Sequence, residues 1–519
     1  MMMRKSFWMA WFAVGTGAGF ATVVSGCFIN TDLSCEHTQV GCPTSGELEG
    51  GRVEASVDCR PSAAAEVAEV CGVFVSSAGT EGGAGTKAAP VKTLAEAVKH
   101  AQEGGTGRVY ACAEAFEGAV EVPAGVTVFG GLDCQKGWRW AEGTRKTRVT
   151  APMGEVPLRL RGGEGEARLE DVEVEAKGIM VGGDAALKGA SSIAVVAEGI
   201  RVSLVRSTLV AGDGAAGEEG AGHGARAGAG ADGTAGRPAC AADGGEPQVE
   251  NLCGTADDVT DDSIGGLGGS GRVYSGGGGE SGLPGLENAG TGADVEAQCE
   301  GKAGGDGESG EGGDGARGLG SLSAAGYVGA KGADGGKGEP GQGGGGGGGR
   351  SGGKGVGQCP QASTGSGASG GNGASGGCGG AGGRGGGAGG ASIALVSLEA
   401  QVVFDDVVLR TGRGGVGGSG GPGQNGGLGG AEGGKGGAVD PAYTQLKEGC
   451  PGGAGGNGGK GGQGGGGLGG HAIGVAFRGV APSLEGAVVT LGEPGAGGTS
   501  ADAEHAGAPG TRADLAAFP

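Results

Sequence analysis

Short stretches of alternating apolar and polar residues recur along this chain. One pattern begins at Ile193 and returns at Ile393 and Ile473, with further apolar residues and a glycine at matching distances after each start. A period of two is typical of β-strands, because successive side chains point to opposite faces. A unit of about twenty residues cannot bury an apolar face alone, so neighbouring units must stack. The pattern therefore predicts stacked parallel strands.

The residues before the first clear repeat predict a strand followed by a short helix. The run 73–75 consists of residue types that favour strands. Thr93 and Glu96 have the spacing of a capping box at a helix N-terminus. Apolar residues recur on one face after Thr93, and Gly104 is placed to end the helix. We therefore expect an amphipathic helix at the beginning of the stack.

This beginning, over residues 71–134, resembles that of pectate-lyase-like right-handed parallel β-helices. In that family a strand, a turn of the form G-T-x-x-x-P-x-x-T-[IL] and a capping helix precede the first coils. Residues 85–94 match the turn, although Val91 stands where the family often has an aromatic residue. The resemblance implies an all-β fold: a right-handed parallel β-helix with a short N-terminal capping helix, interrupted by long glycine-rich insertions.

Two insertions, at about 212–390 and 412–470, leave the repeat at the same glycine of the pattern. We expect them to emerge from the same corner of successive coils. Glycine occupies every third position over long stretches, for example from Gly452 to Gly470. That period matches a polyproline II-type helix, and glycine lets such chains pack closely. A collagen-like helix is disfavoured, because the chain has 18 Pro and the glycine register breaks repeatedly.

The sequence leaves open whether these insertions are ordered. Ordering a residue costs about 1–2 kcal/mol of conformational entropy, and glycine loses the most freedom. The insertions hold few apolar side chains that could offset this cost. Bundles of extended chains and disorder are therefore equal alternatives from sequence.

The segments follow from these patterns and from the N-terminal signal described next. They are a lipoprotein signal peptide (1–26), a cysteine-bearing tether (27–70), the start and first coils of the β-helix (71–211), a glycine-rich insertion (212–390), a β-helix coil (391–411), a second glycine-rich insertion (412–470), a further coil (471–495) and a flexible tail (496–519).

The N-terminus predicts export. Two basic residues precede an apolar stretch, 7–24, which is typical of a secretory signal. The stretch ends in Val24-Ser25-Gly26-Cys27, which resembles the lipobox of bacterial lipoproteins and implies a diacylglycerol on Cys27. An uncleaved signal anchor is the weaker alternative, because glycines interrupt the marginal apolar run. Phe28 after the cysteine implies, by resemblance to known sorting rules, the outer membrane.

The cysteine count agrees with export. The chain has 13 Cys, so acylation of Cys27 leaves an even number for disulfides. Zinc is disfavoured, because no C-x-x-C pair occurs and His is scarce. The candidate disulfide cysteines before the first insertion are Cys35, Cys42, Cys59, Cys71, Cys112 and Cys134. Those within the insertions are Cys240, Cys253, Cys299, Cys359, Cys378 and Cys450.

The net charge argues against polyanionic partners. A formal net charge of −21 repels nucleic acid and an anionic membrane surface. The acidic residues are dispersed, so solubility is the simplest account of them. We expect attachment to a membrane only through the N-terminal lipid.

The chain lacks a recognisable catalytic set. Fragments of the polygalacturonase-like motifs occur at 30–32, 222–224 and Asp405-Asp406, but their order is wrong and Arg-Ile-Lys is absent. Asp405 and Asp406 are adjacent, so on a strand they would face opposite sides. The five His have no metal-ligand spacing. We therefore expect no catalytic site, no metal site and no cofactor.

The arrangement as a whole resembles the glycine-rich PGRS proteins, in the form found in myxobacteria and their relatives. The shared features are a lipobox, a cysteine-rich segment, the β-helix start and inserts of the form GGxGGx. No activity carries over from that resemblance. The expected function is that of a non-enzymatic surface lipoprotein, structural or adhesive, that contacts extracellular polysaccharide or neighbouring cells. The alternatives are an envelope carbohydrate-active β-helix enzyme (a polysaccharide lyase or hydrolase) and a passive spacer.

Overall fold

The computed structural model describes residues 58–163, 165–180, 185–241, 246–254, 259–286, 289–294 and 298–519. Within these residues the protein is rich in parallel β-sheets, and α1 (Leu94–Glu103) is the one α-helix. The expected all-β class is confirmed at this level. The predicted signal peptide, the lipidation residue Cys27 and the cysteines Cys35 and Cys42 lie outside the described residues.

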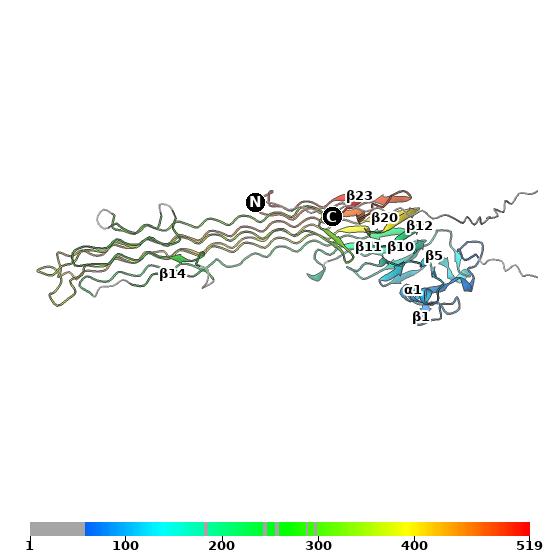
Figure 1. Cartoon of the computed structure of the whole chain (residues 1–519), viewed down its shortest axis with the longest axis horizontal. Coiled ribbons are helices and arrows are strands. Elements are labelled where there is room, and N and C mark those ends of the chain that lie inside the picture. Colours follow the sequence, from blue (N-terminus) through cyan, green and yellow to red (C-terminus); the bar gives the residue numbers. More distant parts are fainter. Residues whose placement is uncertain are drawn as a thin grey trace, which may run out of the picture. The chain divides into compact units, whose positions relative to one another are not determined.

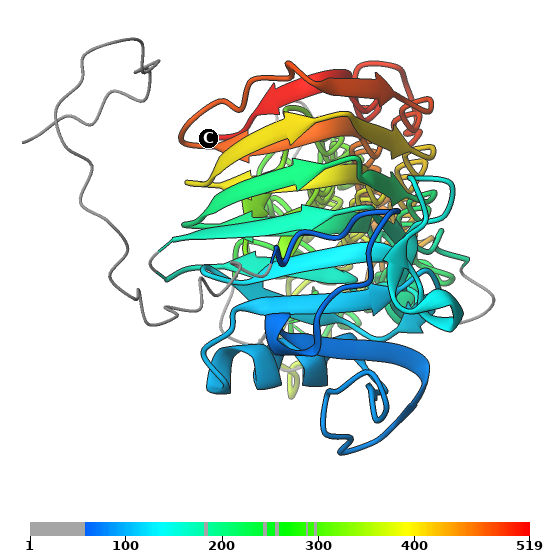
Figure 2. The same cartoon turned by 90° about the vertical axis from the view of Figure 1, so that its right-hand side faces the viewer.

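Three sheets, here named A, B and C, form a stack in which the strands follow one another from the blue to the red end of the sequence (Figure 2). Sheet A contains β1 (Val73–Thr80), β2 (Arg108–Cys112), β5 (Thr127–Asp133), β9 (Glu166–Glu170), β12 (Arg201–Val205) and β19 (Gln401–Asp405), with β6 (Arg139–Trp140) antiparallel to β5. Sheet B contains β3 (Ala115–Glu117), β7 (Thr147–Thr150), β10 (Val172–Ala176), β13 (Thr208–Ala211), β20 (Val407–Thr411) and β22 (Ala487–Thr490). Sheet C contains β4 (Val120–Pro123), β8 (Leu158–Arg161), β11 (Ser192–Glu198), β18 (Ser392–Leu398), β21 (Ala472–Arg478) and β23 (Arg512–Ala517).

The chain visits the three sheets in rotation. From β2 onward, strands of sheets A, B and C follow each other in sequence, apart from the short β6, until β21 leads directly to β22 of sheet B. The predicted repeat is what stacks: Ile193 pairs with Ile393, and Ile393 with Ile473, in parallel register. The prediction of stacked parallel strands is therefore confirmed.

One core cluster gathers apolar side chains from all three sheets. Leu169 of sheet A, Leu209 of sheet B and Leu395 of sheet C belong to it and are 0–2% exposed. The apolar face of α1 packs against the same cluster, where Leu94 and Val98 are buried. The alternating pattern therefore places every second strand residue in a common interior.

The predicted helix start is confirmed in part. The Thr93 hydroxyl accepts a hydrogen bond from the N–H of Glu96 at 3.2 Å, and Gly104 follows the last helical residue. The carboxylate of Glu96 does not complete the expected reciprocal bond. It accepts instead from the N–H of Gly82 at 2.7 Å, and so fastens the preceding loop to the helix.

A hairpin within the first insertion covers the outer face of sheet C. It consists of β16 (Ser321–Ser323) and β17 (Gly326–Val328), and Leu322 and Tyr327 pack in a second core cluster with residues of sheet C. His471, beside these residues, is fully buried. Its Nε2 bonds the Leu319 carbonyl at 3.0 Å and its Nδ1 accepts from the N–H of Thr511 at 2.7 Å, and burial lowers its pKa.

The remaining short elements lie in loops or in the first insertion. They are the 3-10 helices η1 (Glu69–Cys71), η2 (Cys134–Lys136) and η3 (Ala185–Leu187), and the antiparallel pair β14 (Glu250–Asn251) and β15 (Ser263–Ile264).

All the glycine-rich excursions connect a strand of sheet B to a strand of sheet C. They join β13 to β18, β20 to β21 and β22 to β23, and extended segments of them run side by side (Figure 1). We call these side-by-side segments the glycine bundle. The expectation that the insertions share a corner is confirmed, and a third, shorter excursion at 491–511 leaves from the same corner.

The last excursion changes the interpretation of the chain's final residues. Residues 496–519 are expected from sequence to form a flexible tail, but residues 512–517 of this segment form β23, which pairs in parallel with β21. Leu515 joins the main core cluster and Phe518 joins the second one. The apolar residues of this strand are few and separated by Ala, which is why the pattern gives a weak strand signal.

Hydrogen bonds hold the glycine bundle together with a period of three residues. The N–H groups of Gly214, Gly217 and Gly220 donate to carbonyls of the segment 413–419 at 2.7–2.8 Å. The segment 365–391 likewise donates to 215–237 and accepts from 415–437. Three residues per turn is the repeat of a polyproline II helix. Of the two alternatives left open by the sequence, the structure therefore has the ordered bundle.

Glycine is required where two chains of the bundle meet. A Cβ at Gly373 would lie under 3.0 Å from the carbonyl oxygen of Gly344, and one at Gly379 would meet the carbonyl of Gly338 in the same way. The backbones could not separate without losing the hydrogen bonds between them. Glycine at every third position is therefore required for the chains of the bundle to pack against each other.

Five disulfides are present in the described residues, and the expected use of cysteine is confirmed for ten residues. They join Cys59 to Cys71, Cys112 to Cys134, Cys240 to Cys359, Cys253 to Cys378 and Cys299 to Cys450. The last three close loops of 119 to 151 residues within the glycine bundle and its loops. A disulfide stabilises mainly by restricting the unfolded chain, so such long loops gain the most.

We expect Gly373→Ala to destabilise the glycine bundle by about 3 kcal/mol, because the added methyl group overpacks a backbone contact. The matched control is Gly224→Ala, where a Cβ meets nothing within 4 Å. The control is expected to be neutral or stabilising by up to about 1 kcal/mol. Urea unfolding followed by circular dichroism measures both changes, and equal stability of the two variants would contradict the packing requirement.

Candidate binding surface

A recess of about 800 Å³ lies beside the hairpin formed by β5 and β6. Its walls come from the segment 63–66 and from residues 133–145, with Trp140 and Arg145 among them. We call it the Trp140 recess. It combines an aromatic ring with charged and amide side chains on one surface.

The hairpin turn positions Trp140 at the recess. Gly137 and Trp138 both adopt positive φ, at 73° and 59°, which reverses the chain after β5. The Trp138 ring is buried and meets Phe74 edge to face, with the ring centroids 4.9 Å apart. Trp140 then pairs with Leu132 across the hairpin, and its backbone N–H donates to the Ser62 carbonyl at 3.2 Å.

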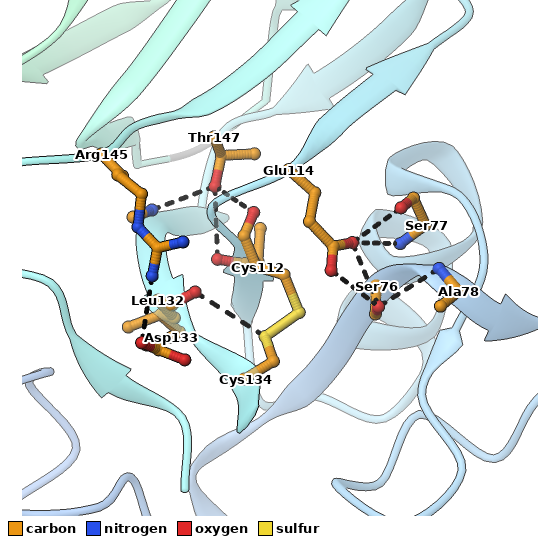
Figure 3. Close-up of a disulfide and its surroundings, with 12 residues drawn as sticks. Ser76, Ser77, Ala78, Cys112, Glu114, Leu132, Asp133, Cys134, Arg145 and Thr147 are labelled. Atoms are coloured by element: carbon orange, nitrogen blue, oxygen red, sulfur yellow. Dashed lines mark hydrogen bonds and ion pairs between the residues drawn. A yellow bond between two sulfur atoms is a disulfide. The ribbon is translucent and has the colours of Figure 1, made fainter. Parts of the chain in front are cut away.

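A disulfide and a buried hydroxyl fix the base of this hairpin (Figure 3). Cys134, directly after β5, is bonded to Cys112 at the end of β2. The Thr147 hydroxyl donates to the Cys112 carbonyl at 2.7 Å and accepts from the N–H of Gly131 at 3.0 Å. The two ends of the loop that carries Arg145 are therefore held against sheet A.

A second contact in Figure 3 ties the neighbouring loop to β1. The Glu114 carboxylate accepts from the Ser77 hydroxyl and the Ser77 N–H, both at 2.7 Å, and from the Ser76 hydroxyl at 3.1 Å. Three donors on one carboxylate satisfy its charge without a cation. Glu114 is therefore committed to holding the loop.

The loop above the disulfide is basic in an otherwise acidic protein. Residues 134–148 hold five basic side chains and one acid, Glu142, whereas the whole chain has a net charge of −21. Asp133 pairs with Arg145 at 3.0 Å and with Lys136 at 3.5 Å, and Glu66 lies 3.8 Å from Arg139. Donors and acceptors therefore alternate around the recess, and its charges nearly balance.

The Trp140 ring connects the recess to a buried ion cluster. The guanidinium of Arg206 lies 5.1 Å from the centre of the ring. Arg206 also pairs with Asp171 at 2.7 Å and with Glu170 at 2.8 Å, and Arg168 pairs with Glu170 at 2.6 Å. We call these four charged residues the Arg206 cluster. It fixes the guanidinium on which the Trp140 ring rests.

The acids of the Arg206 cluster are shielded from solvent, and Glu170 is held in its charged form. Glu170 is 3% exposed and Asp171 is 2% exposed. Burial by itself raises the pKa of Glu170, but hydrogen bonds from Arg168 and Arg206 outweigh it and the net pKa is lowered. The hydrogen bonds that Arg206 donates to Asp171 in turn raise the pKa of its guanidinium. Both carboxylates are therefore buried and paired with Arg206, so they fix the fold and do not face a ligand.

Lys146 lies on the other side of Arg145 and faces sheet B. Its ammonium donates to the Thr208 hydroxyl at 2.7 Å, and burial lowers its pKa despite nearby acids. Arg148, two residues on, pairs with Glu173 at 2.8 Å across sheet B. The basic loop thus continues onto sheet B, where its cations are anchored by neighbouring strands.

The residues that the sequence compares with polygalacturonase motifs are not brought into one site. Asp405 ends β19 and Asp406 follows it at a φ of 56°, and both are exposed. His223 lies in the glycine bundle, where its Nε2 is 3.2 Å from the Gly382 carbonyl. Residues 30–32 lie outside the described residues. Within the part of the chain that the structure describes, no group of three or more potential metal ligands occurs.

Comparison with known proteins gives no relative for this chain: no family model, curated protein or solved structure matches it. In the described ranges, no helix has the length and apolar character needed to cross a membrane. The Trp140 recess and the glycine bundle are therefore the features from which a function can be inferred.

Sequence reasoning did not single out the Trp140 recess. The available signal is the composition of residues 134–148, which combine two of the chain's four Trp with five basic residues. Tryptophan and arginine are enriched in binding surfaces. Their partners Glu66 and Arg206 are distant in sequence and could not be assigned without the fold.

We expect Arg206→Met to destabilise the sheet stack by about 3–5 kcal/mol, because it leaves the buried Asp171 without its ion-pair partner. Arg148→Met is the matched control, since Arg148 is half exposed and pairs with Glu173 at the surface. That change should cost at most about 1 kcal/mol. Denaturant unfolding of both variants is the measurement, and similar losses would show that the Arg206 cluster has no special role.

Proposed function

We propose that this protein is a non-enzymatic lipoprotein of the cell surface with a structural or adhesive role. The observation that carries the proposal is the glycine bundle. Three excursions from one corner of the sheet stack form a single hydrogen-bonded array, and three disulfides link its segments and loops. An array of this kind offers a broad surface with little side-chain specificity, which suits contact with a matrix better than catalysis.

We further propose that the three sheets are the walls of a right-handed parallel β-helix with α1 as its N-terminal cap. The rotation of successive strands through sheets A, B and C supports this arrangement. So does the parallel pairing of equivalent residues from one repeat to the next, as in Leu204 with Phe404. In this architecture the stack supports the bundle and the bundle presents the surface.

We propose that a lipid on Cys27 attaches the protein to the outer membrane. Its support is the tetrapeptide Val24-Ser25-Gly26-Cys27 after an apolar stretch. A lipid at this cysteine would leave residues 28–57 between the membrane and the first described residues. One acyl-bearing residue is enough to keep the protein at the envelope while the rest remains outside the bilayer.

The proposed ligand of the Trp140 recess is extracellular polysaccharide. Sugar hydroxyls both donate and accept hydrogen bonds, so they match a surface on which Arg145 and Asp133 stand side by side. The Trp140 ring supplies an apolar platform for a sugar face. A carbohydrate-active enzyme is the alternative function. Its acid would have to come from the walls of the recess, where Asp133 and Glu66 are already in ion pairs.

We expect the mature chain with Cys27→Ser to be retained on polysaccharide columns without cleaving the polysaccharide. A panel of acidic and neutral polysaccharides, scored for retention and for new reducing ends, tests both parts. Trp140→Ala should weaken retention about three- to tenfold, since an aromatic contact contributes about 0.5–1.5 kcal/mol. Tyr274→Ala is the control, because Tyr274 is an exposed aromatic residue of the first insertion. New reducing ends would replace the adhesive function with the enzymatic one.

We expect full-length protein made in a bacterium to partition into the detergent phase at the cloud point, and Cys27→Ser to move into the aqueous phase. Cys35→Ser serves as the control and should stay with the detergent. Incorporation of labelled palmitate gives a second readout for the same variants. A Cys27→Ser protein that stays with the detergent would indicate an uncleaved signal anchor instead.

A further inference from the structure

The glycine bundle contains a groove that is only partly filled. The groove lies along the segments 412–438 and 449–471, which run antiparallel. N–H groups of the second segment donate to carbonyls of the first along their length. Residues 492–499, from the last excursion, lie in its first part as a third chain. Beyond Thr499 no segment of the described chain continues along the groove, and we call that part the open groove.

The filled part shows how the groove holds a chain. The N–H groups of Gly414, Gly417 and Gly420 donate to the carbonyls of residues 493, 496 and 499 at 2.8–2.9 Å. In the other direction, Gly495 and Gly498 donate to carbonyls of the opposite wall, both at 2.8 Å. Each wall therefore offers one backbone group per three residues to the chain between them.

Most of the same groups continue along the open groove without partners, and Gly429 is the exception. Within the described residues no hydrogen bond satisfies the N–H groups of Gly423, Gly426, Gly433 and Gly436, or the carbonyls of Gly452, Gly455, Gly458 and Gly461. Gly423, Gly426 and Gly461 are nevertheless buried. Buried backbone groups are nearly always paired, with protein or with water. The open groove therefore presents one row of carbonyls at every third residue. The facing N–H groups keep that spacing from Gly423 to Gly429, after which a step of four residues leads to Gly433.

One amide side chain already imitates such a chain. The side-chain oxygen of Asn457 accepts from the N–H of Gly429 at 3.2 Å, in the middle of the open groove. An amide side chain offers the same donor and acceptor as a peptide group. A partner chain that runs past Gly429 therefore replaces this contact with one of its own carbonyls.

A chain that lies in the groove must have glycine at every third residue. In the filled part, a Cβ at Gly492, Gly495 or Gly498 would lie under 3.0 Å from a wall carbonyl. The residue after each of these glycines supplies the carbonyl that accepts from the wall, and Pro494 is accepted at the third position. A triplet of the form Gly-x-Pro therefore satisfies the groove, and proline favours the extended helix beforehand.

We propose that the open groove binds an extended partner chain with glycine at every third residue, in the polyproline II conformation. At about 3.1 Å per residue, the stretch with unbroken three-residue spacing, from Gly423 to Gly429, is about 19 Å long. The partner continues the interface that residues 492–499 begin, with the same donors and acceptors. This inference is independent of the Trp140 recess and of the lipid on Cys27.

The test uses a fluorescent peptide of repeated Gly-Ala-Pro triplets and the disulfide-bonded mature chain with Cys27→Ser. We expect saturable binding by fluorescence anisotropy. A peptide of repeated Ala-Ala-Pro has the same length and backbone preference but no glycine, and should bind at least tenfold more weakly. Equal binding of the two peptides, or binding of neither, would overturn the proposal.

A pair of protein variants locates the binding. Asn425 is exposed on the wall of the open groove, so Asn425→Trp should fill the entrance and weaken Gly-Ala-Pro binding at least tenfold. Glu219→Trp places the same ring at an exposed position on the segment that leaves β13, and should leave binding unchanged. Circular dichroism verifies that both variants keep the fold. Sedimentation that shows self-association blocked by Asn425→Trp would overturn the proposal by assigning the groove to a second copy.

Discussion

The close approach of backbones is the constraint on which the rest of this structure depends. In the glycine bundle, peptide groups of neighbouring chains satisfy each other directly, with no sheet ladder and little apolar burial to help. This is possible only because the residues at the contacts, such as Gly373 and Gly344, have no Cβ. Each hydrogen bond contributes little in net terms, about 0.5–1.5 kcal/mol, but the bonds recur at every third residue. Many small hydrogen-bond contributions therefore stabilise the ordered bundle together. The disulfides add to this stability by restricting the unfolded chain.

The sheet stack allows these hydrogen bonds to form, because it fixes where every excursion starts and ends. Thr208 pairs with Val408, and Val408 with Val488, so chains that leave after them start in register. Residues in contact across the bundle keep that register: Arg413 bonds Asp213, 200 residues earlier, and Thr499 bonds Ser419, 80 residues earlier. Alignment at the corner is thus transmitted along the bundle by backbone contacts of fixed period.

Periodicity explains what could be predicted from the sequence. The twofold alternation after Ile193 predicts the stacked strands, and the threefold glycine repeat predicts extended chains that leave from one corner. Both predictions depend on features that repeat, and both are confirmed. The order of the bundle was undecided, because it follows from contacts between segments as far apart in sequence as Gly214 and Arg413.

Features that occur once were missed for the same reason. The hairpin with Leu322 and Tyr327 has too few apolar residues to stand out in a glycine-rich insertion, yet it seals a face of sheet C. The strand at 512–517 is short and rich in Ala, and pairing with β21 decides its conformation. The Trp140 recess depends on Glu66 in its wall and on Arg206 against the Trp140 ring, and only the fold brings both near the hairpin. Single contacts between distant segments leave no pattern in one sequence.

The shared corner also governs how such a chain could change in length during evolution. An excursion that leaves sheet B must return to sheet C, so residues added on the way out must be matched on the way back. A single inserted residue would place side chains where Gly423 or Gly461 now stand. Paired gains and losses of whole triplets would keep this register. One exception exists: Gly430 and Gly434, which accept from Gly455 and Gly452, are four residues apart, so one segment holds a single extra residue.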